Sequence, residues 1–185
     1  YNAMRRVVLG DRNLEKISLL NDLSRKMVIG SCSLDYAFRK MKDIKNKTRY
    51  SNLAVLSALT ISAPFFAIMF GGTFKDSIVS FVVMAVEAAF LLFIGRYKVI
   101  YFLTNFLGAF ISTVLVMTLA KFFLIHNPVS IIIVSLMPLV PGVQITNSVR
   151  DFMAGDYLSG IIGVQSAIFV SVAIALGVVM GLKIV

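Results

Sequence analysis

An apolar run at residues 129–140 ends in a proline–glycine pair, Pro141-Gly142, and the chain turns polar directly after it. Lipid cannot satisfy the backbone groups that a broken membrane helix exposes, so such a break is tolerated only where it lines a cavity or packs on protein. Transporter binding sites are often built from interrupted spans of this kind. The pair therefore predicts a half-helix that starts near the membrane centre, with a small-molecule site at its start.

This half-helix offers unsatisfied donors in its first turn. The amides of Val143 and Gln144 lack intrahelical acceptors and carry the positive end of the helix dipole. Both features suit a carboxylate ligand. Pro141 loses nothing there, because the first helical position needs no amide donor. Gln144, Asn147 or Ser148, and Asp151 follow on one helical face, and Arg150 with Asp151 marks the predicted cytoplasmic exit.

Glu87 is the one acidic residue well inside a long apolar segment. Intramembrane acids are costly and usually face the interior of the helix bundle. At about 1.5 Å per helical residue, Glu87 lies about 15 Å and Pro141-Gly142 about 18 Å from the outer surface, whereas Asn105 lies about 9 Å from the cytoplasmic one. We interpret Glu87 as the proton-coupling residue; the alternative is a structural hydrogen bond to Asn105 or Gln165.

The predicted site is a binding site rather than a catalytic or metal centre. One Cys and one His cannot form a zinc or iron–sulfur site. Paired catalytic acids, a zinc motif and a nucleophile elbow are missing from the sequence, so we predict neither an enzyme nor a cofactor. The predicted substrate-binding residues are Pro141, Gly142, Val143, Gln144, Asn147, Arg150, Asp151 and Asn105.

Composition places these residues in a membrane protein. The 185-residue chain is 58% hydrophobic with a mean hydropathy of +0.89, which is unlike a soluble domain of this size. Residues 1–50 hold 12 of the 18 Lys and Arg and five of the nine acids. We therefore predict an all-α protein with a short cytoplasmic N-terminal segment, residues 1–50, and a transmembrane domain, residues 51–185.

The transmembrane domain is predicted to contain five spans joined by short connections. Each apolar segment approaches the roughly 20 residues that cross a bilayer. The fourth span is the broken one. The predicted segments are 53–70, 77–95, 99–120, 129–147 and 157–182.

Two amphipathic helices are predicted before the spans. Apolar residues recur at helical spacing in 13–29 and again from Leu34 to Ile44. The second helix carries a basic opposite face, which suits anionic lipid headgroups and sets the topology. Residues 3–9 are expected to form a short strand or a loop.

The distribution of positive charge predicts the orientation. With the N-terminus inside, the cytoplasmic side carries fifteen Lys and Arg and the outer side only three: Lys75, Lys121 and Lys183. The positive-inside rule then places the N-terminus in the cytoplasm and the C-terminus outside. Small residues at Thr104, Gly108 and Ser112, and the pair Gly177 and Gly181, predict close helix packing.

Three segments together resemble the signature of the threonine/serine exporter family. They are Pro138-Leu-Val-Pro-Gly-Val-Gln-Ile-Thr-Asn-Ser-Val-Arg-Asp151, Gly155-Asp-Tyr-Leu-Ser-Gly160 and Phe70-Gly-Gly-Thr-Phe-Lys-Asp76. The helical pair at residues 14–44 is similar as well, so the resemblance covers nearly the whole chain.

The resemblance implies a multi-pass inner (plasma) membrane exporter of small amino acids, driven by the proton gradient. It also implies a second, smaller hydrophobic unit as partner, fused or separate; a homo-oligomer is a further expectation. We expect a subunit that binds a small carboxylate-bearing substrate, protons and membrane lipid, and no nucleic acid. Two alternatives stay open: a dicarboxylate (succinate) exporter subunit, as in a related bacterial pair, and a non-transporting membrane scaffold or sensor.

Overall fold

The computed structural model describes residues 14–46, 50–97, 99–122 and 125–185. Every regular element in these ranges is a helix, so the predicted all-α fold is confirmed. The expected strand or loop at residues 3–9 lies outside the described part. The helices are α1 (Leu14–Val28), α2 (Leu34–Asn46), α3 (Asn52–Met69), α4 (Phe74–Ile94), α5 (Tyr101–Phe122), α6 (Pro128–Leu136), α7 (Gly142–Met153) and α8 (Tyr157–Ile184).

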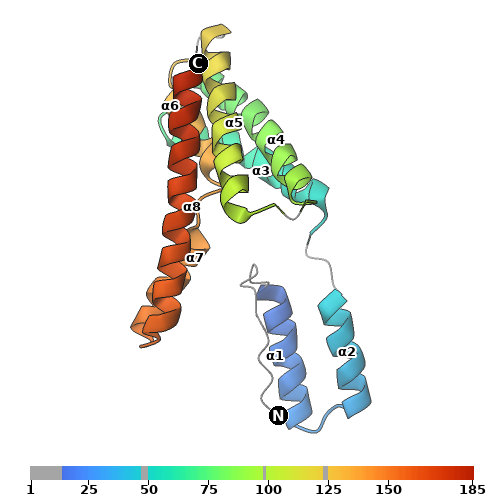
Figure 1. Cartoon of the computed structure of the whole chain (residues 1–185). Coiled ribbons are helices and arrows are strands. Elements are labelled where there is room, and N and C mark those ends of the chain that lie inside the picture. The colour runs from blue at the N-terminus through green and yellow to red at the C-terminus, as the bar shows by residue number, and fades with distance from the viewer. Residues whose placement is uncertain (1–13, 47–49, 98, 123–124) are drawn as a thin grey trace. The chain divides into compact units, whose positions relative to one another are not determined.

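The contacts divide the chain into two units, Tyr1–Ser51 and Asn52–Val185. The described part of the first unit is a hairpin of α1 and α2 (Figure 1). The second unit holds α3 to α8. Four of its helices, α3, α4, α5 and α8, are long and apolar enough to cross a membrane.

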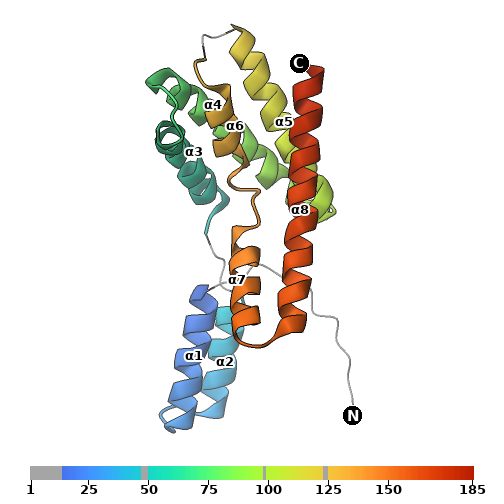
Figure 2. The ribbon, with the colours of Figure 1, turned by 90° about the vertical axis from the view of Figure 1, so that its left-hand side faces the viewer.

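The predicted fourth span is divided between two short helices. The chain leaves helical geometry after Leu136 and re-enters it at Gly142, so α6 and α7 are separate elements. Figure 2 shows α7 continuing below α6, beside the long α8. Neither helix reaches the length of a span by itself, and the crossing of the pair as one broken span stays a prediction.

The longest helix, α8, packs closely against α5. A Cβ atom added at Gly177 would lie 2.5 Å from the Phe106 carbonyl oxygen, and one at Gly181 would lie 2.8 Å from Cβ of Thr113. Only glycine allows the two backbones to approach this closely, which is how small residues stabilise membrane helix pairs. The predicted role of Gly177 and Gly181 in helix packing is confirmed.

Helix α6 lies among α3, α4 and α5 at the centre of the bundle. Its Val134 packs with Ala63, Ala67 and Met84, and its Ile131 and Ile132 pack with residues of α4 and α5. Because α6 is held on several sides, the position of the following break is fixed by the bundle core.

Candidate functional site

Glu87 lies on α4 and faces α5. Its side chain is 1% exposed, and its carboxylate oxygen Oε2 accepts a hydrogen bond from the Ser112 hydroxyl. The same hydroxyl lies 2.9 Å from the Gly108 carbonyl oxygen, one turn earlier on α5. Glu87 is therefore enclosed by protein, as expected for an acid inside a membrane span.

The second carboxylate oxygen of Glu87, Oε1, is buried and has no hydrogen-bond partner in the described part of the chain. A Cβ atom at Gly108 would lie 2.7 Å from this oxygen and 3.2 Å from Cδ1 of Leu139. The space that the missing side chain of Gly108 leaves is thus bordered by both Glu87 and Leu139. We call Glu87, Gly108, Ser112 and Leu139 the carboxyl site.

Leu139 brings the helix break to the carboxyl site. It is 3% exposed and packs with Ala109 of α5 and with Val170 and Ile174 of α8. Within the break, the Leu139 amide donates to the Leu136 carbonyl at 2.9 Å, and the Gly142 amide donates to Val140 at 2.8 Å. The break therefore packs on protein, which is what a break at membrane depth would require.

The start of α7 carries no side-chain cap. Pro141 occupies the N-cap position, and the Ile145 amide donates to its carbonyl oxygen at 3.1 Å. Gly142 is exposed, and Val143 is 65% exposed. The amides of Val143 and Gln144 therefore stand at an uncapped, accessible helix start, where a carboxylate would be favoured.

Four polar residues of α7 lie on one side of the helix, which packs against α8. Ser148 is 2% exposed and contacts Gly163, at a position where a Cβ atom could not fit. Gln144 has a buried side-chain oxygen with no hydrogen-bond partner among the described residues. At 100° per residue, Gln144, Asn147, Ser148 and Asp151 share this face.

Two other predicted binding residues lie away from the carboxyl site. Arg150 is exposed, and no ion pair joins it to Asp151 within the ranges that the structure describes. Asn105 is buried, and its side-chain nitrogen donates to the Tyr101 carbonyl of its own helix at 2.7 Å. Arg150 and Asn105 thus belong neither to the carboxyl site nor to the polar face of α7.

The alternative interpretation of Glu87, a structural hydrogen bond to Asn105 or Gln165, does not match the structure. Ser112 is the hydrogen-bond partner of Glu87 instead. Gly108 and Ser112 were assigned to helix packing alone. Their four-residue spacing on α5, near the depth of Glu87, was the signal that could have identified them.

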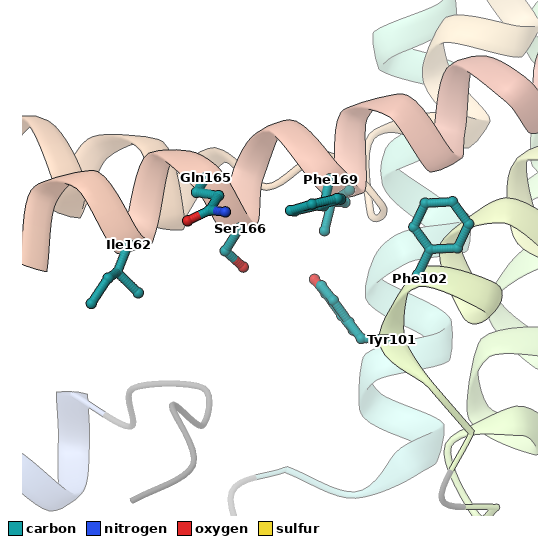
Figure 3. Close-up of a pocket in the computed structure, with 7 residues that line it drawn as sticks. Tyr101, Phe102, Ile162, Gln165, Ser166 and Phe169 are labelled. Carbon is teal, nitrogen blue, oxygen red and sulfur yellow. The ribbon is translucent and has the colours of Figure 1, made fainter.

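A pocket of about 320 Å³ lies between α5 and α8. Figure 3 shows Tyr101 and Phe102 on α5 facing Ile162, Gln165, Ser166 and Phe169 on α8. Glu87 and Gly142 are not among its lining residues. The helix break is therefore not part of this pocket. It packs on the bundle through Leu139.

The Phe70–Asp76 segment ends in a buried carboxylate, which forms a structural junction. Asp76 is fully buried; its Oδ2 accepts from the Thr73 amide at 2.8 Å, and its Oδ1 accepts from the His126 amide at 3.0 Å. Thr73 in turn caps α4 in a capping box. Asp76 therefore joins the start of α4 to the connection that leads into α6.

These features define a multi-pass membrane protein with an acid enclosed in its helix bundle. A family model described as "Putative threonine/serine exporter" (ThrE) matches residues 1–185, and the chain belongs to this family of exporters. No curated protein and no solved structure matches the chain.

Replacing Asp76 with alanine is expected to destabilise the protein markedly. It removes the charged acceptor of the Thr73 and His126 amides, and a hydrogen bond to a charged group contributes about 1.5–3 kcal/mol. Asp156 is the matched control because it caps α8 through Ser159 at an exposed position. Asp156→Ala should cost only about 1 kcal/mol. Thermal unfolding in detergent measures the stability of both variants. Equal losses of stability would show that the hydrogen bonds of Asp76 contribute no more than an exposed helix cap does.

Proposed function

We propose that this chain is a subunit of a proton-driven secondary exporter that moves small amino acids, threonine or serine, out of the cytoplasm. Membership of the exporter family supports the transport class. The observation that carries the proton-coupled mechanism is the buried, unpaired Oε1 of Glu87 beside Leu139. An ionisable group and a side chain of the interrupted segment thus border the same space beside Gly108.

The Ser112 hydroxyl allows Glu87 to exist in either protonation state. When Glu87 is ionised, Ser112 donates its single hydrogen to the carboxylate. When Glu87 is protonated, the carboxyl O–H donates to Ser112, which then donates to the Gly108 carbonyl, 2.9 Å away. Both states keep the hydroxyl satisfied, which suits a residue that binds and releases a proton in each cycle.

In the proposed cycle, the Glu87 carboxylate binds a proton from outside. It then releases this proton to the cytoplasm and becomes ionised. The ionised carboxylate then pairs with the ammonium group of the substrate. The substrate carboxylate binds the Val143 and Gln144 amides at the uncapped start of α7. Gln144, Asn147 and Asp151 line the adjoining face, and Asn105 is given no role because its amide nitrogen bonds its own helix.

Leu139 provides the proposed coupling between the two groups. Its side chain closes over Gly108 and Glu87, while the backbone that follows it leads directly into the start of α7. A shift of α7 on substrate binding would therefore move Leu139 and open the carboxyl site. Alternating access of this kind is typical of transporters with broken helices.

We further propose that the chain sits in the cytoplasmic membrane with its N-terminus inside, as the Lys and Arg distribution favours. A second, smaller membrane unit or another copy is its expected partner. Helix α7 packs mainly on α8, and its opposite side leaves Ile145 (44%), Val149 (50%) and Met153 (85%) exposed. This apolar side requires lipid or such a partner.

Glu87→Gln is expected to abolish serine efflux driven by a pH gradient, because glutamine cannot carry a proton. The assay uses proteoliposomes that contain the chain and its partner unit. Correct folding is checked by an unchanged unfolding midpoint. Efflux at the wild-type rate in this variant would refute the proposed proton carrier.

Ser112→Ala tests the hydrogen bond that serves both protonation states. Losing a bond to a charged group costs about 1.5–3 kcal/mol, so efflux should fall at least about tenfold. Thr113→Val is the matched control, because the neighbouring Thr113 hydroxyl bonds only the Ala109 carbonyl of its own helix. Equal efflux by the two variants would remove Ser112 from the mechanism.

Arg150→Ala distinguishes a zwitterionic substrate from a dicarboxylate. A zwitterion needs one anion site and one acid, whereas succinate needs a second anion site, for which the exposed Arg150 is the candidate. We expect serine efflux to change less than about twofold. Arg96→Ala, another exposed basic residue, is the control. Succinate efflux that exceeds serine efflux and disappears in Arg150→Ala would favour the dicarboxylate alternative.

A further inference from the structure

The α1–α2 hairpin buries very little of its apolar surface. Its core consists of Leu23, Ala37 and Ile44, with Leu19 and Cys32 packed beside them. Many other large apolar side chains are exposed on the two helices. A contiguous exposed apolar surface commonly marks an interaction site.

Apart from Tyr36, the exposed apolar residues of α1 and α2 form one stripe on each helix. At 100° per residue, both stripes are rotated by about 75° in the same sense from the buried positions. Because the two helices of the hairpin run antiparallel, equal rotations bring both stripes to the same side. We call this side the apolar face: Ile17 (45% exposed), Leu20 (40%), Met27 (39%), Leu34 (67%), Phe38 (66%) and Met41 (43%).

The opposite side of the hairpin is polar. Lys26 and Asp22 form an ion pair there at 2.8 Å. Leu19, Lys40 and Asp43 line a shallow pocket between the helices on the same side, which agrees with the antiparallel geometry. The two sides of the hairpin are thus chemically distinct.

Basic residues accompany the apolar face. Lys45 lies within it and Lys42 at its edge, and both are exposed. Residues 14–46 contain seven Lys and Arg against four Asp and Glu. Long basic side chains can keep their charge at the headgroups while their stems cover apolar surface. This combination is typical of helices that lie in a bilayer interface.

Chain connectivity keeps the hairpin near a membrane. Helix α2 ends at Asn46, and the first candidate span begins at Asn52. The intervening residues reach about 20 Å at most, even when fully extended. A lipid surface is therefore always within reach of the apolar face.

We propose that the apolar face of the α1–α2 hairpin docks on an anionic lipid surface. The apolar side chains enter the boundary between headgroups and acyl chains, and Lys42 and Lys45 bind the phosphates of acidic lipids. The acids Asp22 and Asp43 lie on the opposite side, away from the lipid charge. The hairpin is thereby held flat on the membrane surface.

The test compares two spin labels on opposite sides of α2 in the full chain. Cys32, the only cysteine, is first replaced by alanine. Labels are then placed at Phe38→Cys on the apolar face or at Tyr36→Cys on the polar side, where the native residue is 51% exposed. Nanodiscs contain phosphatidylcholine alone or with phosphatidylglycerol. Relaxation by oxygen and by a water-soluble nickel chelate reports the depth of each label.

With phosphatidylglycerol, the Phe38→Cys label should be accessible to oxygen and shielded from nickel, while the Tyr36→Cys label stays in water. Adding Lys42→Gln and Lys45→Gln should lower the ratio of lipid-inserted to water-exposed hairpin by about fivefold for each charge removed. Three results would overturn the proposal: a Phe38→Cys label in water, insertion independent of lipid charge, or shielding from both reagents, which would indicate a protein partner.

Discussion

The structure depends on how one carboxyl group is accommodated inside a membrane bundle. Glu87 is fully enclosed, Ser112 donates to one of its oxygens, and Gly108 leaves room for the other. Leu139 closes the same space from the helix break. Because lipid offers no compensation for a buried polar group, any movement of Leu139 changes the surroundings of the carboxyl. The carboxyl group and the helix break thus border one space inside the bundle.

Much of the arrangement follows from local sequence signals. Long apolar runs predict the helices of α3, α4, α5 and α8 to within a few residues, because the bilayer sets their length and composition. Pro141-Gly142 correctly marks the end of the apolar segment and the start of α7. Gly177 and Gly181 predict the close approach of α8 to another helix, though not which one.

The partners of buried polar groups could not be predicted in the same way. Ser112 and Glu87 are 25 residues apart, and the sequence does not encode the rotation that brings them together. Asp76 reaches His126 across 50 residues, so the motif around it shows a capping box but not the junction. The apolar stripes of α1 and α2 lie on the same side of the hairpin. This likewise becomes evident only when the two helices are packed against each other.

The most direct test of the account is the number of protons exchanged when substrate binds. Calorimetry of serine binding in buffers of different ionisation enthalpy, performed on the chain with the partner unit proposed above, gives this number. The account predicts that serine displaces a proton from the wild-type protein and none from Glu87→Gln. Equal proton release from both proteins, or serine binding to the wild type with no proton release, would contradict it.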